Sequence, residues 1–378
     1  MSNYITEITI NKVRHLENLS IHLGDEKKHL ILTGKNGSGK TSVLENLDKY
    51  FIKTANIETF IESDFIKISQ TLYPIFKLNT SEDIFDYHEK NQLLYAFFSA
   101  KRTTNSMEKP SGIEKIELSN IKDEKLNRYF LKYIVALKAE RSFAKDDNDN
   151  ETVKKIDNWF NTFEEMLKQI FNDPSVSLEF DRRNIMSYNF LIKRNNRELF
   201  DFTTLSDGYS AIIDIVTEIL LKIETTEAKS FDVEGIVLID EVETHLHVEM
   251  QKNIMPLLTS FFPNIQFIVT THSPFVLSSL SNSIIYDLES KTQVEDVSGY
   301  SYEALVETYF NVDKYTHELK EKLSQYKILN QKRINKTIDD DELTEYFKLE
   351  SFFDKLPHYK NEELGYILNK IELEKLGA

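Results

Sequence analysis

The stretch that most constrains the fold is the octapeptide GKNGSGKT at residues 34–41. It follows the apolar segment HLILTG at 29–34 and precedes TSVLENLDKYFI at 41–52, whose apolar residues recur with helical spacing. Glycines let backbone N–H groups turn inward around phosphate oxygens, and the N-terminus of the following helix adds a partial positive charge. A strand, a glycine loop and a helix in this order fit the pattern G-x-x-x-x-G-K-[ST], so we expect an α/β fold that binds a nucleotide.

The residues of this loop are expected to have separate tasks. Lys40 is expected to reach the β- and γ-phosphates, and the hydroxyl of Thr41 to bind Mg²⁺. The other candidate contacts to the nucleotide are Gly34, Asn36, Gly37, Ser38, Gly39 and Ser42. A chance glycine-rich turn is the alternative, and the strand and helix on either side argue against it.

Composition limits the class of protein. The chain has 62 Asp plus Glu against 46 Lys plus Arg, a net charge of −16, which argues against a surface that binds nucleic acid everywhere but allows a local basic groove. The lack of cysteine excludes disulfides, thiolate zinc sites and cysteine nucleophiles. The N-terminus does not resemble a signal peptide, and no 18 apolar residues run together, so we expect a soluble, cytoplasmic protein without a membrane span.

Apolar segments alternate with helical patterns along the chain, which predicts a parallel sheet covered on both faces. The strands are expected at 4–10, 16–23, 29–34, 93–102, 176–180, 235–240, 265–274 and 282–288, with a hairpin around the turn KRNNR at 193–197. Helices are expected at 41–52, at 122–171 in two runs separated by the polar segment 144–152, at 208–223, and from the end of the strand at 240 through about 258. The pattern is mixed and mainly helical at 55–91, and charged and helical from about 302.

The apolar segment GIVLID at 235–240 ends on an acid that is followed by a second one. Ligands of parallel sheets bind at the carboxyl ends of the strands. We therefore expect Asp240 to hold Mg²⁺, directly or through water, and Glu241 to polarise the attacking water as general base. A buried strand that ends in solvated acids is the alternative, which the phosphate loop upstream disfavours.

Three histidines raise a rival hypothesis, a transition-metal site formed by His245, His247 and His272. On a helix, residues two apart point about 200° away from each other, so His245 and His247 could share a metal only if that turn is irregular. His272 ends the apolar segment at 265–274. An imidazole there could contact phosphate or water beside the expected γ-phosphate position.

Four segments in this order, GKNGSGKT, LSDGYS, VLIDEVETHLH and VTTHSP, resemble the ABC-type ATPases of the SMC/RecF/OLD branch of the AAA family. The likeness covers most of residues 1–50 and 176–290. It implies an ABC-ATPase head, in which a P-loop sheet joins an N-terminal antiparallel β-lobe, with helical insertions. The implied domains are an ATPase domain at 1–300, interrupted by a mainly helical insertion at about 52–172, and a C-terminal helical region for partner binding or oligomerisation at 301–378.

By this resemblance LSDGYS at 205–210 is the signature that faces the γ-phosphate held by a second subunit. Ser206 and Gly208 stand in the matching places, while Asp207 replaces the usual glycine. A carboxylate near phosphate is unfavourable, so we expect Asp207 to point away or to cap the helix.

The resemblance also assigns residues outside the signature. His272 matches the switch histidine, and Arg14 with its neighbour His15 becomes a candidate nucleotide contact. Glu243, His245 and His247 are expected at the interface between subunits. The glutamine of the Q-loop is not identified, and Gln70 and Gln92 are the two weak candidates.

Within this branch, YAFFSAKR, LSDGYSAIIDIVTEIL and the charged C-terminal region resemble the stand-alone ATPases of bacterial antiphage systems of the Septu and retron type. The likeness implies a homodimer or higher homo-oligomer that encloses ATP and Mg²⁺. It further implies ATP hydrolysis, which can be slow, and control of a separately encoded nuclease of the HNH or TOPRIM kind.

A RecF-like ATPase of DNA repair or maintenance, which binds DNA on a basic face, is the alternative. Its candidate contacts, each more often a solvated charge, are Lys101, Arg102, Arg182, Arg183, Lys193, Arg194 and Arg197. A transporter ATPase is disfavoured because the helical insertions are too long for that role. The run DDDE at 339–342 is expected to be a solvated acidic stretch and not a metal cluster.

Overall fold

The computed structural model describes most of the 378-residue chain up to Lys355 and scattered positions beyond it. The residues outside the description are 1–2, 56–75, 81–91, 103–106, 115, 119–120, 122–124, 184–187, 227–229, 296, 298, 301, 303, 306–308, 310–316, 356–365, 367, 369 and 372–378. The chain forms two compact units, Met1–Phe310 and Asn311–Ala378.

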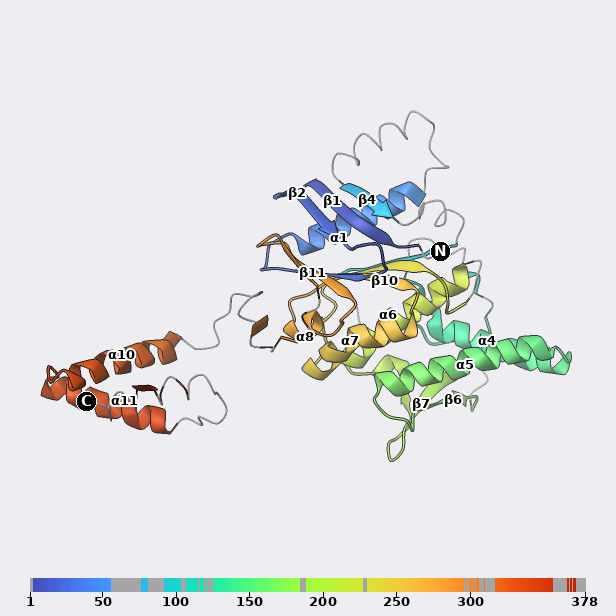
Figure 1. Ribbon diagram of the computed structural model, residues 1–378. Coiled ribbons are helices and arrows are strands. Elements are labelled where there is room, and N and C mark those ends of the chain that lie inside the picture. Colours follow the sequence, from blue (N-terminus) through green and yellow to red (C-terminus); the bar gives the residue numbers. More distant parts are fainter. Residues whose placement is uncertain are drawn as a thin grey trace. The chain divides into compact units, whose positions relative to one another are not determined.

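A six-stranded sheet that includes β10 and β11 forms the centre of the first unit (Figure 1). Its strand order is β12-β11-β3-β10-β9-β5. Its strands are β3 His29–Thr33, β5 Leu94–Phe98, β9 Gly235–Ile239, β10 Ile265–Thr270, β11 Ser283–Asp287 and β12 Thr292–Glu295. Neighbours pair in parallel except for β11 and β12, which pair antiparallel. Every residue of β3, β9, β10 and β11 is buried, as expected of a sheet that is covered on both faces.

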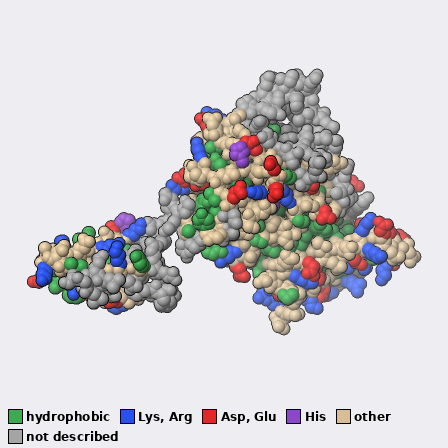
Figure 2. All heavy atoms as spheres, in the orientation of Figure 1, with side chains coloured by type: hydrophobic (Ala, Val, Ile, Leu, Met, Phe, Trp, Pro, Cys, Tyr) green, Lys and Arg blue, Asp and Glu red, His purple; other side chains and the backbone are tan. Residues whose placement is uncertain are grey.

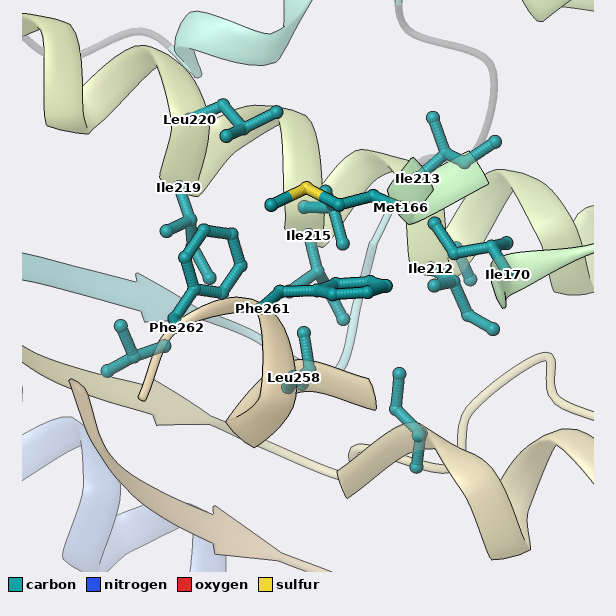
Figure 3. Packing of buried hydrophobic residues seen from close by; sticks show 14 of the residues in the cluster. Met166, Ile170, Ile212, Ile213, Ile215, Ile219, Leu220, Leu258, Phe261 and Phe262 are labelled. Atoms are coloured by element: carbon teal, nitrogen blue, oxygen red, sulfur yellow. The ribbon is translucent and has the colours of Figure 1, made fainter. Parts of the chain in front are cut away.

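Alternate residues of each strand enter two different cores. On β3, Leu30 and Leu32 pack with helix α1 (Lys40–Ala55) and the N-terminal strands, whereas Ile31 lies in the core on the other face. That second core is built by α5 (Asn150–Ile170), α6 (Asp207–Thr225) and α7 (Val248–Phe261). Figure 3 shows Met166 and Ile170 of α5 among the isoleucines of α6 and the aromatic end of α7.

A small antiparallel sheet, β2-β1-β4, lies on the α1 side of the central sheet (Figure 1). It comprises β1 Ile5–Val13, β2 Leu16–His22 and β4 Phe76–Thr80. The prediction of a mainly helical segment at 55–91 is wrong at β4, because this short stretch pairs with the free edge of β1. Residues 56–75, which include Gln70, and residues 81–91 lie outside the described residues.

The range expected as an insertion contains both sheet and helix. β5 pairs with β9, so this part of 52–172 belongs to the central sheet. The turn η3 (Leu126–Tyr129) leads into α4 (Phe130–Asp146), which is followed by α5. The predicted break at 144–152 is narrower in the structure, because the side chain of Asp149 accepts the N–H of Thr152 and starts α5 at once.

A third sheet precedes α6 and consists of β6 Ser177–Asp181, β7 Asn189–Lys193 and β8 Phe200–Asp201. β7 and β8 pair antiparallel, which confirms the hairpin predicted around KRNNR. The first unit therefore has the expected fold class: a mainly parallel α/β sheet, an N-terminal antiparallel lobe and covering helices.

The second unit is built by α10 (His317–Ile334) and α11 (Asp340–Asp354), which bury Leu323, Tyr326 and Tyr346 between them. The acidic run at 339–342 begins α11. Asp339 is the N-cap and forms a reciprocal capping box with Glu342, which explains the clustered acids without a metal. Over the described parts of the whole chain, no helix is long and apolar enough to cross a membrane.

Buried polar groups lie where α6 packs on η3. A carboxylate oxygen of Glu218 accepts the backbone N–H of Asn127 at 2.7 Å, while Oδ2 of Asp214 has no hydrogen-bond partner. Burial raises the pKa of Asp214 to about 7 and Glu218 adds to the rise, against the opposing influence of Lys125, Asn127 and Arg102. The charged form of Asp214 is therefore disfavoured in the folded chain.

Replacing Asp214 should change how stability depends on pH. Because the folded pKa of Asp214 lies above the ordinary value of 3.8, ionisation of this group lowers the stability of the wild-type chain as pH rises from about 4 to about 7. In Asp214→Asn this loss is absent. The Tm of the variant minus the Tm of the wild type should therefore increase by roughly 2–6 °C between about pH 5.5 and pH 8. Thermal unfolding followed by circular dichroism measures it, and a difference that does not vary with pH would contradict the assignment.

Candidate functional site

The phosphate loop is the turn between β3 and α1, and its glycines adopt backbone angles that other residues avoid. Gly34, Gly37 and Gly39 have φ of 132°, 83° and 101°. A Cβ on Gly34 would lie 2.8 Å from Oγ of Ser38, and one on Gly39 would lie 2.8 Å from a methyl carbon of Leu16. The loop shape therefore requires glycine at these positions, as a backbone cradle for phosphate does.

Lys40 is only 5% exposed and lies against the carbonyls of its own loop. Its Nζ donates to the carbonyl oxygens of Gly34 at 2.8 Å and Lys35 at 3.1 Å. Burial lowers the pKa of Lys40, while nearby acids, Glu241 foremost, oppose this shift. The ammonium group is thus held at the loop by neutral carbonyl oxygens. Charged phosphate oxygens would accept stronger hydrogen bonds from it.

The rim of the loop is open. Asn36, Gly37 and Thr41 are exposed, Ser38 and Gly39 are partly buried, and Ser42 is buried in the first turn of α1. The exposed groups surround the N-terminus of α1, where the helix dipole favours an anion.

Asp240 follows β9 and is 1% exposed. Its Oδ1 accepts the hydroxyl of Thr270 at 2.6 Å and that of Thr41 at 3.3 Å. The structure thus brings together the two residues predicted to hold the metal. A carboxylate and a hydroxyl on facing elements are hard oxygen donors of the kind that Mg²⁺ prefers, so the donor set fits this ion.

Glu241 has a left-handed backbone with φ of 47°, which is unusual for a residue other than glycine. Its N–H donates to Oγ1 of Thr270 at 2.7 Å, and its carbonyl oxygen accepts Nη2 of Arg102 at 2.7 Å. Its carboxylate accepts the hydroxyl of Thr244 at 3.3 Å. The predicted base is therefore partly buried and fixed through its peptide.

His272 follows β10, which lies between the strand of the phosphate loop and the strand of the acids. Burial lowers the pKa of His272 and the positive charge of Lys40 adds to this, although Glu241 and Asp240 oppose it. A lowered pKa leaves the imidazole neutral near pH 7, able to donate from one nitrogen and accept at the other.

Glu243 has a role that the sequence did not reveal. Its carboxylate accepts the hydroxyl of Thr271 at 2.8 Å and the backbone N–H of His272, while its expected place at a subunit interface remains a prediction. Burial raises the pKa of Glu243, against these hydrogen bonds. The side chain therefore stabilises the end of β10. The sequence feature that pointed to Glu243 was the presence of a third acid two residues after Glu241.

The helix expected directly after Asp240 begins only at Val248. Residues 241–247 form turns instead, because Glu241 and His245 have φ of 47° and 70° and His247 is the N-cap of α7. Both histidines are exposed. In the described parts of the chain, no group of three or more His, Cys, Asp or Glu could hold a metal ion, so the histidine site finds no support.

The signature segment opens α6. Ser206 is the exposed N-cap and its side chain makes no capping hydrogen bond, whereas Asp207 is the exposed first residue of the helix. Asp207 therefore does not cap the helix, contrary to one expectation, but points to solvent in agreement with the other. A Cβ on Gly208 would lie 2.9 Å from Sδ of Met250 and 3.3 Å from the carbonyl oxygen of His245, so α6 approaches this turn closely at Gly208.

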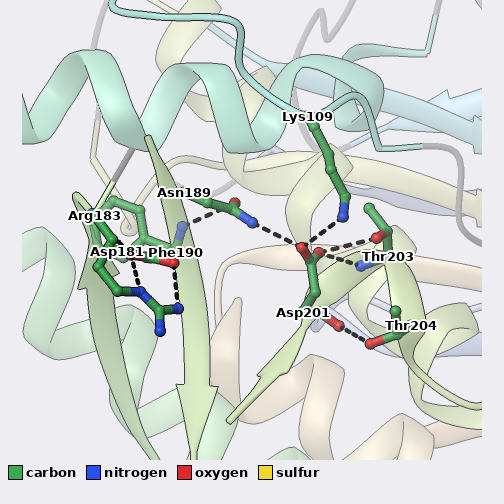
Figure 4. A network of polar contacts seen from close by, with 8 residues as sticks. All are labelled: Lys109, Asp181, Arg183, Asn189, Phe190, Asp201, Thr203 and Thr204. Carbon is green, nitrogen blue, oxygen red and sulfur yellow. Dashed lines mark hydrogen bonds and ion pairs between the residues drawn. The ribbon is translucent and has the colours of Figure 1, made fainter. Parts of the chain in front are cut away.

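Asp201 fixes the segment that leads into the signature (Figure 4). It accepts the N–H of Thr203 at 2.8 Å, the amide of Asn189 at 2.7 Å and the ammonium of Lys109 at 3.0 Å. The turn η4 (Phe202–Thr204) is thereby held, and Ser206 lies two residues beyond its end. The exposed hydroxyl of Ser206 thus stands on a rigid support.

The turn between β1 and β2 lies against the phosphate loop. Nε2 of His15 is 3.2 Å from the carbonyl oxygen of Ser38, while Arg14 in the same turn is exposed with φ of 54°. His15 is therefore the neighbour of the loop in this turn, and the assignment of Arg14 remains a prediction. Gln92 is exposed ahead of β5, and neither glutamine is identified with the Q-loop.

The basic residues named for DNA do not form one free patch. Arg102 is 7% exposed and bonded to Glu241, so its assignment as a DNA contact is wrong. Arg183 pairs with Asp181 and Arg194 with Asp173. The other candidates, Lys101, Arg182, Lys193 and Arg197, are exposed, and Figure 2 shows basic and acidic side chains interspersed on the face drawn.

Comparison with known protein families gives a match over the middle of the chain. Residues 112–278 match the family described as "AAA domain, putative AbiEii toxin, Type IV TA system". The matched range contains the signature, both acids after β9 and His272, whereas the phosphate loop at 34–41 precedes it.

Similar curated proteins include the Septu protein PtuA of Bacillus mycoides (strain KBAB4), 24% identical over 98% of this chain and 55% of that protein. The Retron Ec83 probable ATPase of Escherichia coli is 30% identical over 50% of this chain and 42% of that protein. The chain thus spans about half the length of these two relatives. Septu PtuA of Bacillus thuringiensis is 25% identical over 73% of each chain. These matches confirm the resemblance to the Septu and retron ATPases.

Among solved structures, an SMC head bound to the C-terminal winged-helix domain of ScpA aligns with a TM-score of 0.42 at 13% identity. The alignment covers 75% of this chain and 93% of that one.

The geometry of the loop predicts that Lys40→Ala loses nucleotide binding. Without the ammonium group, phosphate charge at the loop is no longer neutralised, so the Kd for Mg·ATP should rise by about 100-fold or more. Titration calorimetry measures the affinity. The matched control is Lys49→Ala, an exposed lysine farther along α1, which should bind like the wild type. Unchanged binding by Lys40→Ala would contradict the site.

Proposed function

We propose that the chain binds Mg·ATP and hydrolyses it to ADP and phosphate. The observation that carries this proposal is the meeting of three strand ends: the phosphate loop after β3, Asp240 and Glu241 after β9, and His272 after β10 between them. The relatives named as probable retron ATPases support it.

In the proposed mechanism the loop amides and Lys40 hold the phosphates. Thr41 and Asp240 would hold Mg²⁺, which when bound neutralises charge on the phosphates. Glu241 accepts the proton of the attacking water, and the neutral imidazole of His272 donates a hydrogen bond to the γ-phosphate or the water. Because the peptide of Glu241 is fixed, its carboxylate stays positioned beside the attacking water.

We further propose that two copies of the chain, or a higher homo-oligomer, enclose the nucleotides. The N-terminus of α6 is exposed and the hydroxyl of Ser206 is not used for capping, so both are free to contact the γ-phosphate held by another copy. Gly208 brings this helix close to the turn 241–247. A contact between Ser206 and bound ATP would therefore act on the turn that begins with Glu241.

The proposed biological role is the ATPase subunit of a cytoplasmic bacterial antiphage complex that controls a separate nuclease of the HNH or TOPRIM kind. Two observations support it: the names of the similar proteins, Septu PtuA and retron ATPase, and a helical C-terminal unit with its own core. Direct DNA binding by a repair-type ATPase has less support, since Arg102 is buried and two other candidates are paired.

Glu241→Gln should separate binding from hydrolysis. The amide keeps the size of the side chain but cannot take a proton, so turnover should fall by about 100-fold or more while the Kd for Mg·ATP stays within about threefold. Phosphate release and calorimetry measure the two quantities. Glu249→Gln, an exposed acid in the first turn of α7, is the matched control. Normal hydrolysis by Glu241→Gln would refute the assignment of the base.

The defence role predicts a phenotype in cells. Phages should form plaques less efficiently on a strain that carries the gene with its natural neighbours than on a strain with Lys40→Ala in the same locus. The variant should fail to protect because it has lost nucleotide binding. Equal plating over a panel of phages would contradict the role in defence and leave the proposed ATPase chemistry standing.

A further inference from the structure

Arg102 lies four residues beyond the end of β5, and its guanidinium group is buried against the turn that carries Glu241. Its Nη2 donates to the carbonyl oxygen of Glu241 at 2.7 Å and lies 3.5 Å from that of Val242. Its Nε and Nη1 are buried without a hydrogen-bond partner. Burial lowers the pKa of Arg102, and the nearby acids Glu243, Asp240, Glu241 and Asp214 oppose this.

The sheet explains how Arg102 reaches this turn. β5 and β9 are parallel neighbours in the register Phe98 to Ile239, and the N–H of Asp240 continues the ladder by donating to the carbonyl oxygen of Phe98 at 2.8 Å. The chain that leaves β5 therefore runs beside the chain that leaves β9. Four residues beyond the ladder, the arginine side chain crosses to the peptide of the base.

The peptide that Arg102 contacts is the strained one. A non-glycine residue at φ of 47° is held there only if its surroundings fix it. For Glu241 the fixing contacts are the bond from its N–H to Thr270 and the bond from Arg102 to its carbonyl oxygen. One lies on each side of its α-carbon, so together they set the direction in which the carboxylate leaves the backbone.

Stability alone does not account for an arginine at this place. A buried cation with two nitrogens lacking acceptors is unfavourable, and an apolar side chain of similar length would fill the space without that penalty. Unsatisfied buried groups in a native structure are typical of strained functional sites. We therefore attribute the buried arginine to its contact with the peptide of Glu241.

We propose that Arg102 is a positioning residue for hydrolysis, which acts through the peptide of Glu241. The inference rests on the proposed function, in which Glu241 is the general base. Arg102 fixes the left-handed conformation of Glu241 and thereby the position of its carboxylate at the reacting water. Its effect is on turnover and not on the capture of ATP, which the phosphate loop performs.

The first test compares Arg102→Met with Arg102→Lys. Methionine removes the donor, so kcat should fall by about 10- to 100-fold with the KM for ATP changed less than about threefold. Lysine can still donate one hydrogen bond to the carbonyl oxygen of Glu241 and should recover part of the loss. Arg183→Met, which removes an exposed arginine of the β6 region, should leave kcat and the melting temperature unchanged.

The second test combines Arg102→Met with Glu241→Gln. If Arg102 acts through Glu241, the double variant hydrolyses ATP no more slowly than Glu241→Gln alone, because nothing remains to be positioned. If Arg102 only supports the fold, the two losses multiply and the KM rises, which would overturn the proposal. Should Arg102→Met not fold, the same comparison is made with Arg102→Lys.

The outcomes distinguish this inference from the function on which it rests. Normal hydrolysis by Glu241→Gln means that the proposed base is wrong. Impaired hydrolysis by Glu241→Gln together with wild-type kcat in Arg102→Met refutes the positioning role alone.

Discussion

The candidate site depends on one hydroxyl group, that of Thr270 at the end of β10. It donates to Oδ1 of Asp240 and accepts the N–H of Glu241, so a single atom fixes both acids. It can do so because β10 pairs with β9 in the register Val269 to Ile239, which places Thr270 beside Asp240. The same strand pairs on its other side with β3, where the phosphate loop begins. The whole site is therefore held by the pairing of three buried strands.

Around this centre, each polar group is held by a neighbouring strand end or turn. Glu243 reaches back to the end of β10, Arg102 crosses from the end of β5, and His15 comes from the lobe that covers α1. Most of these contacts involve backbone groups at strand ends, where the ladder no longer satisfies them. Burial also lowers the pKa of Lys40 and His272, because it disfavours the charged forms of both side chains.

The sequence could predict the features that have a fixed residue spacing or a strong hydrophobic period. GKNGSGKT identified the loop, and the apolar runs identified β3, β9 and β10 with Asp240 and Glu241 at the correct edge. The sequence could not reveal Arg102, because its task depends on the pairing of β5 with β9, or the turns of 241–247, because two residues with positive φ leave no pattern. β4 was missed since five residues are too few to show alternation against a mixed background.

We propose that ATP is hydrolysed where the phosphate loop of one copy meets Ser206 of another. Complementation between two inactive variants, Lys40→Ala and Ser206→Arg, tests it most directly. Each alone should show almost no phosphate release, because every site lacks one half. An equimolar mixture forms mixed dimers with one intact site, so it should recover about a quarter of the wild-type rate. Wild-type activity of Ser206→Arg alone, or a mixture no more active than its components, would contradict the account.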